Sequence, residues 1–197
     1  MTPSLPELAL AAGGAAASGL RLYGTVAALG FLERVGAIHL PGRLTVLAST
    51  PILILATVLF VLEFLADKIP VVDSVWDAVH TFIRVPAAAV LGFAALGDVA
   101  EPWRTGAALL CGTIAFSSHG LKAGTRLALN ASPEPLTNWA ASLSEDVIVA
   151  GLIWLIVSHP AAALVAGIVV LAAGLLLASW LYRSVKALFV RRGAPLY

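Results

Sequence analysis

The chain reads PAAALVAGIVVLAAGLLLASWLY from Pro160 to Tyr182, and this stretch decides its fold class. Apart from the Tyr182 phenol, none of its side chains can ionise. A helix needs roughly 20 apolar residues to cross the hydrocarbon core of a bilayer. Trp and Tyr favour the membrane interface, which suits Trp180 and Tyr182 at the end of the stretch. The stretch therefore predicts a transmembrane helix.

The composition extends this prediction to the whole chain. Hydrophobic residues make up 60% of the 197 residues and charged residues 12%, whereas soluble domains hold about 45–50% and about 25%. A soluble domain this apolar would have too little polar surface to face water. We therefore expect one membrane domain over residues 1–197, an all-α polytopic transmembrane helical bundle in contact with the lipid bilayer.

The other apolar segments set the expected number of spans. Segments 8–32, 46–62 and 105–121 are long or nearly long enough to cross, whereas 85–97 and 147–158 each offer only about a dozen apolar residues. Each short segment follows an amphipathic stretch bounded by proline, 69–84 or 132–146. We predict five or six spans, with two short segments that are broken, re-entrant, or simply shallow or tilted.

Basic residues and a short repeated motif give information on the membrane topology. Lys and Arg favour the cytoplasmic side, and the tail after Tyr182 carries Arg183, Lys186, Arg191 and Arg192, so we expect a cytoplasmic C-terminus. The motif at residues 18–21, Ser-Gly-Leu-Arg, returns at 119–122 as His-Gly-Leu-Lys. A degenerate inverted repeat with halves 8–97 and 103–182 would explain this repeated motif. Matches this short also arise by chance in Ala-, Gly- and Leu-rich sequence.

Charged residues at membrane depth are functional candidates, because a buried charge in a bilayer costs several kcal/mol unless it is paired or hydrated. At about 100° per residue, Asp73, Asp77, His80 and Arg84 share one helical face. Asp73, Asp77 and His80 could ligate a metal ion or pass protons. The alternative is an interfacial helix whose polar face meets water.

A second, basic stripe contains Lys122 and Arg126, together with His119 and Asn130 on the same helical face. It could hold a phosphate or carboxylate, or it could neutralise the acidic residues. Glu63 and Asp67 share a face one turn apart, whereas Glu145 is expected to cap the start of a helix.

Arg21 sits in the middle of the first apolar segment, too deep to reach the membrane surface easily. It should therefore meet a carboxylate, a backbone carbonyl or a water-filled cavity. We predict that the acidic stripe of Asp73 and Asp77 lies near at least one of Arg21, Lys122 and Arg126. The candidate residues for binding an ion or solute are Arg21, Glu63, Asp67, Asp73, Asp77, His80, Lys122 and Arg126.

Several function classes have no support in the sequence. The net charge of +1 and the absence of a basic stripe interleaved with aromatics argue against nucleic-acid binding. One cysteine, Cys111, cannot form an intrachain disulfide. Nucleophile elbows, Walker loops, His-Glu-x-x-His and dinucleotide fingerprints are missing, so we predict no enzyme and no catalytic residue, and we assign no cofactor.

Several strings together resemble a known family. They are Ser18 to Arg21, Ala66 to Pro70, Asp73 to Asp77, His119 to Arg126, Asn130 to Pro135 and Ser144 to Asp146. Over residues 10–185 the chain is similar to a bacterial membrane family catalogued as a domain of unknown function, number 4126. The resemblance implies a multi-pass protein of the bacterial inner (plasma) membrane with a polar interior, and it names no substrate.

These observations favour transport. We expect a small transporter or channel for an ion or small charged solute, with charged and small residues lining its interior. Small residues would also allow close helix packing and a homo-oligomer. One alternative is a lipid-handling protein in which Arg21, Lys122 and Arg126 grip a lipid phosphate. Another is a membrane scaffold whose charges only pair with each other.

Overall fold

The computed structural model describes residues 2–69, 71–130 and 135–192 of the chain, and in these ranges it is helical with no strand. The all-α prediction is confirmed for this part of the chain. The elements, in order, are α1 (Leu5–Leu20), α2 (Leu22–Arg34), the 3-10 helix η1 (Gly42–Ala48), α3 (Thr50–Ala66), α4 (Val72–Ala95), α5 (Glu101–Asn130), α6 (Pro135–Ser158) and α7 (Pro160–Arg192).

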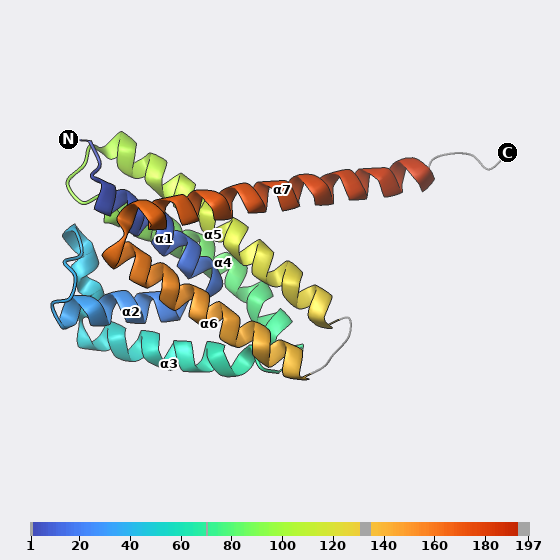
Figure 1. The fold of residues 1–197 in the computed structure, drawn as a ribbon, viewed down its shortest axis with the longest axis horizontal. Coiled ribbons are helices and arrows are strands. Elements are labelled where there is room, and N and C mark those ends of the chain that lie inside the picture. Colours follow the sequence, from blue (N-terminus) through green and yellow to red (C-terminus); the bar gives the residue numbers. More distant parts are fainter. Residues whose placement is uncertain (1, 70, 131–134, 193–197) are drawn as a thin grey trace.

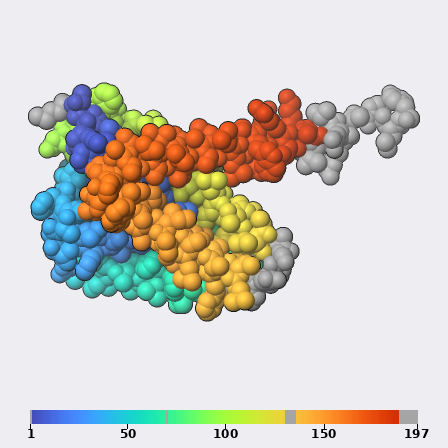
Figure 2. Space-filling view, viewed as in Figure 1, coloured from blue at the N-terminus to red at the C-terminus, as the bar shows by residue number. Residues whose placement is uncertain are grey.

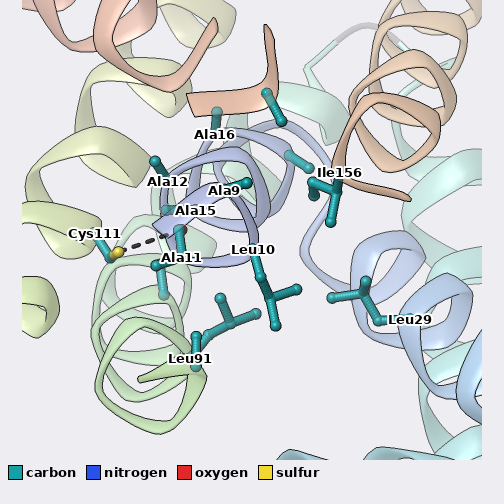
Figure 3. Packing of buried hydrophobic residues seen from close by; sticks show 14 of the residues in the cluster. Ala9, Leu10, Ala11, Ala12, Ala15, Ala16, Leu29, Leu91, Cys111 and Ile156 are labelled. Atoms are coloured by element: carbon teal, nitrogen blue, oxygen red, sulfur yellow. Dashed lines mark hydrogen bonds between the residues drawn. The ribbon is translucent and has the colours of Figure 1, made fainter. Parts of the chain in front are cut away.

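Helix α1 forms the centre of the bundle, with α4, α5, α6 and α7 packed around it (Figure 1). Every residue from Ala9 to Gly19 is buried, and almost all are Ala or Gly. Such small side chains let neighbouring backbones approach closely. Figure 3 shows the result: Leu91 and Ile156 pack against the alanines of α1, and the Cys111 thiol donates to the carbonyl of Ala11 at 3.3 Å.

At Gly19, helix α1 lies in close contact with α5. A Cβ at Gly19 would lie 2.5 Å from the carbonyl oxygen of Ala115 and 2.6 Å from Cβ of Ser118. Because backbone cannot move aside cheaply, Gly19→Ala should lower the free energy of unfolding by about 1–3 kcal/mol. Reversible unfolding in mixed detergent micelles would measure the change.

Gly151 is the matched control for this substitution. It also lies in a helix, and a Cβ there would meet nothing within 4 Å. Gly151→Ala should be neutral or should stabilise the protein by up to about 1 kcal/mol, through helix propensity alone. Equal effects at the two glycines would contradict the packing explanation.

Three helices in the described ranges are long and apolar enough to cross a membrane: α4, α6 from Leu136, and α7 as far as Ala187. Elements η1 and α3 pass the same test together, but they are bent by 68° at the break between them. The distal part of α7 projects past the other helices (Figure 2). It leaves large apolar side chains exposed there, including Leu176, Trp180 and Leu181.

The prediction of two short or broken segments at 85–97 and 147–158 requires a correction. Each segment continues the amphipathic stretch before it, so α4 and α6 are single helices of 24 residues. Pro86 lies inside α4 without ending it, because a proline removes only one backbone hydrogen bond and can bend a helix rather than stop it. The predicted helices over 69–84 and 132–146 are confirmed for residues 72–84 and 135–146; residues 70 and 132–134 lie outside the described ranges.

Two other expected spans, 8–32 and 46–62, are each interrupted in the structure. The expected span 8–32 divides at Arg21, whose φ of −141° and ψ of 83° separate α1 from α2. The expected span 46–62 begins within η1, before the 68° bend into α3. Mean hydropathy did not reveal either interruption, because Arg21 is the only charged residue in 8–32 and residues 46–62 contain none.

Candidate functional site: a buried charge network

Nine ionisable side chains meet inside the bundle, and we call them the charge network. They come from the α1–α2 break and from helices α3 to α6: Arg21, Glu63, Asp67, Asp77, Arg84, Lys122, Arg126, Glu145 and Asp146. Eight of them are at most 10% exposed at the side chain, and Asp146 is 23% exposed.

Helical periodicity explains why α4 and α5 place these side chains in the interior of the bundle. Asp73, Asp77, His80 and Arg84 are all buried, so the predicted acidic stripe of α4 faces the protein interior. This contradicts the alternative in which the stripe meets water. On α5, Lys122 and Arg126 are likewise buried and point the same way.

The break at Arg21 exposes the carboxyl end of α1 to these cations. Arg84 Nη1 donates to the Gly19 carbonyl at 3.1 Å, and Lys122 Nζ donates to the Leu20 carbonyl at 3.4 Å. A helix leaves its last carbonyls without partners and carries partial negative charge there, which favours cations. The interruption therefore supplies two oxygen ligands in the middle of the bundle.

Lys122 is surrounded by oxygen atoms from four elements of the fold. Besides the Leu20 carbonyl, its Nζ lies 2.8 Å from Asp67 Oδ2, 3.3 Å from Asp77 Oδ1 and 3.4 Å from Glu145 Oε2. We call these four atoms the oxygen cage. The ammonium group thus occupies a position that carbonyl and carboxylate oxygens make suitable for a cation.

The three arginines close the network around the cage. Arg21 pairs with Asp67, lies 2.8 Å from Asp146 through Nε, and donates through Nη2 to Ser142 Oγ at 2.9 Å. Arg84 pairs with Glu63 and lies 3.3 Å from Asp77.

Arg126 is held in the same way. Its Nη2 lies 2.9 Å from Glu145 Oε1, and its Nη1 donates to the backbone carbonyls of Asp67 and Asn138 at 3.0 and 3.2 Å.

Two histidines lie beside the network, and the partners of His119 fix it as a neutral group. Arg84 can only donate, so His119 Nδ1 accepts from it at 2.8 Å and the proton is on Nε2, facing Thr81 Oγ1 at 2.7 Å. His80 Nδ1 donates to the Trp76 carbonyl at 2.7 Å, and its Nε2 lies 3.2 Å from the Tyr23 hydroxyl. The His119 ring therefore adds no charge to the network.

The nine groups comprise four cations and five carboxylates, and Lys68 at the rim is a fifth cation, with Nζ 3.4 Å from Ser142 Oγ and its charge acting on Asp146 and Asp67. Several buried carboxylate oxygens have no hydrogen-bond donor among the described residues, including Glu63 Oε2, Asp67 Oδ1 and both oxygens of Asp146. Burial raises the pKa of Asp67, but the positive charges of Lys122, Arg21 and Arg126 outweigh it and hold that pKa below its ordinary value.

The predicted contact between the acidic stripe and a cation is confirmed, because Asp77 lies 3.3 Å from Lys122. Of the eight candidate residues, Arg21, Glu63, Asp67, Asp77, Lys122 and Arg126 join the network. Asp73 is buried at the start of α4, where its Oδ1 accepts from the Ser74 amide at 2.6 Å. His80 instead contacts Tyr23 and stacks on Trp76.

The metal hypothesis for Asp73, Asp77 and His80 requires a correction. Across the described parts of the chain, no group of three or more His, Cys, Asp or Glu side chains is placed to hold a metal ion. Asp73 and Asp77 share a face with His80, but both ring nitrogens of His80 are engaged by Tyr23 and Trp76.

Three residues of the network were not among the candidates. Arg84 shares the face of Asp77, so helical periodicity alone was enough to find it. Glu145 was expected to cap a helix, but α6 begins at Pro135 and places Glu145 and Asp146 well inside it. The hydropathy minimum before residue 147 suggested a boundary where the helix in fact continues.

Comparison with known families follows the resemblance in the sequence. Residues 8–183 match the family described as domain of unknown function (DUF4126), and the chain belongs to this family. No curated protein and no solved structure matches the chain.

Proposed function

We propose that the protein is a membrane transporter for a small charged solute, and more narrowly for a monovalent cation that exchanges with the ammonium of Lys122 in the oxygen cage. The observation that carries this proposal is the cage itself. It combines a carbonyl from an interrupted helix with three carboxylates. Interrupted helices whose carboxyl ends coordinate Na⁺ or H⁺ are a recurring feature of secondary transporters.

The atoms of the cage favour a cation over an anion, because three carboxylate oxygens and one carbonyl oxygen converge there. An anion could bind only if a cation of the network first left its carboxylate. Lys122 is suited to exchange because its flexible stem carries a compact charge with no fixed geometry. When it swings out of the cage, the oxygens that it leaves are ligands for a solute ion.

The proposal requires an arrangement in the membrane. Helices α1 and α2 form a re-entrant hairpin, since Glu7 near the start of α1 and Pro41 beyond the end of α2 both lie beside Gly97. Elements η1 with α3 make one bent crossing, and α4, α5, α6 and α7 make four more, which gives five. An odd number places the termini on opposite sides, and the basic residues after Tyr182 favour the cytoplasm for the C-terminus. We place the protein in the bacterial inner membrane, and an assembly of several copies stays a prediction.

Flux into vesicles tests the proposal. The full chain is reconstituted in liposomes, and uptake of ²²Na⁺ and ⁸⁶Rb⁺ tracers and of protons, reported by an enclosed pH dye, is compared with that of protein-free vesicles. We expect flux of at least one of these cations. Lys122→Met should reduce it by about tenfold or more, equivalent to about 1.4 kcal/mol in a barrier, because the site loses the charge that alternates with the solute.

Lys186→Met is the matched control, because Lys186 is exposed on α7 and it should leave the flux unchanged. Wild-type vesicles that carry none of the three cations would contradict the proposal. A correctly folded Lys122→Met protein with full flux would remove Lys122 from the mechanism.

Dense pairing within the network favours one second candidate, a structural scaffold. Every cation of the network already lies within 4 Å of a carboxylate. These pairs are sufficient to join the helices without a bound solute. The scaffold predicts no flux in any variant. The lipid-phosphate alternative ranks lower because Arg21, Lys122 and Arg126 are all engaged with protein carboxylates.

A further inference from the structure

A large groove opens beside the charge network. It has a volume of about 790 Å³ and lies between α2, α3 and α6, whose positions Figure 1 shows. Its walls are apolar, with Phe31 and Phe60 among them, and the charged side chains that line it are Arg21 and Asp146. Sites for small molecules have this volume and this character, an apolar body with a few placed polar groups.

The two charged residues are not equally available to a ligand. Arg21 is 1% exposed at the side chain and also pairs with Asp67 and contacts Glu145 and Ser142. The Asp146 side chain is 23% exposed, although both its carboxylate oxygens are buried, and its only ion pair within 4 Å in the described residues is with Nε of Arg21. Neither oxygen of Asp146 accepts a hydrogen bond from a described residue. A cation in the groove would therefore be attracted by the Asp146 carboxylate, whose oxygens become accessible when that side chain rotates, and Arg21 would keep its contacts with Asp67, Glu145 and Ser142.

We infer that this groove binds a lipophilic organic cation, with its positive charge beside Asp146 and its apolar part along α2 and α3. The inference is independent of exchange at Lys122, because the groove opens to the outside of the bundle and the cage does not need to be occupied or vacated. The aromatic walls add to the attraction for a cation, since ring faces carry negative charge density.

An anionic head group is disfavoured at the same position. It would lie beside Asp146 and near Glu145, where like charges repel, and the guanidinium of Arg21 is buried behind its own partners. A phospholipid brings a phosphate and is disfavoured for the same reason. The negative charge of Asp146 thus favours cationic over anionic ligands among apolar molecules of similar size.

Two probes of the same shape and opposite charge test the inference. Tetraphenylphosphonium and tetraphenylborate, each radiolabelled, are equilibrated by dialysis with the purified full chain in neutral detergent, and protein-free micelles are subtracted. We expect saturable binding of tetraphenylphosphonium. Asp146→Asn should weaken it by about tenfold, the effect of a partly exposed ion pair worth about 1.4 kcal/mol.

A second pair of variants tests the place of binding without touching the charges. Ala150 lines the groove and is exposed, so Ala150→Trp should fill the groove and reduce binding by about tenfold or more. Ala172→Trp, at an exposed position on α7, and Glu101→Gln, which removes an exposed carboxylate, should leave binding unchanged. If Asp146→Asn does not fold, Ala150→Trp and the two wild-type probes still decide the question.

The contrary outcomes are distinct. Tighter binding of tetraphenylborate, binding that Asp146→Asn leaves unchanged, or no saturable binding would overturn the inference. So would a copurifying phospholipid or a second copy of the chain that Ala150→Trp displaces, as seen by native mass spectrometry. Binding without cation flux would retain this inference and remove the transport proposal, whereas flux without binding would do the reverse.

Discussion

Replacing Asp67 with asparagine is expected to lower the free energy of unfolding by about 3–5 kcal/mol, the cost of leaving buried charges without their partner. Asp67 is fully buried at the end of α3, and its Oδ2 lies within 4 Å of three cations, Arg21, Lys122 and Arg126. The amide keeps the shape of the side chain and removes only its charge. Reversible unfolding in mixed micelles, followed by tryptophan fluorescence, measures the change.

The same experiment has a pH dependence and a control. Because the pKa of Asp67 is lowered in the folded protein, its stabilisation is fully present above the ordinary aspartate pKa of about 3.9 and is lost as the pH falls through the lower folded value. Asp98→Asn removes an exposed carboxylate and should change stability by no more than about 0.5 kcal/mol. An Asp67→Asn protein as stable as this control would contradict a structural role for the network.

The contact between Asp77 and Lys122 should give non-additive effects on stability. Asp77→Ala alone leaves Arg84 and Lys122 each short of one carboxylate, and Lys122→Ala alone leaves the four oxygens of the cage facing one another. The double variant removes both members of the pair. It should therefore be milder than the sum of the single changes by about 1–3 kcal/mol in the free energy of unfolding.

A pair of distant residues, Asp77 and Arg34, provides the reference for this double-mutant cycle. Arg34 lies at the exposed end of α2, where it donates to Thr50 at 3.0 Å. Combined with Asp77→Ala, Arg34→Ala should be additive within about 0.5 kcal/mol. Additivity of the Asp77 and Lys122 changes to the same degree would show that the 3.3 Å contact carries no coupling.

Local patterns in the sequence were enough for part of this structure. Helical periodicity placed Asp73, Asp77, His80 and Arg84 on one face of α4, and Lys122 and Arg126 on one face of α5. Energetics then required charges of both signs to meet, since each would be costly alone in an apolar bundle. The same local signals were misleading at 85–97 and 147–158, where a polar face turned inward looked like the end of a helix.

The sequence by itself determined an apolar, all-helical chain with polar stripes, because composition and the 3.6-residue period depend only on neighbours along the chain. Only the tertiary structure decided that α1 ends at Leu20, that oxygens of Leu20, Asp67, Asp77 and Glu145 converge on Lys122, and that Asp146 lines a groove. These features join residues from helices far apart in sequence. Their contacts depend on how closely the Ala- and Gly-rich face of α1 lets α4, α5, α6 and α7 approach, which no local pattern encodes.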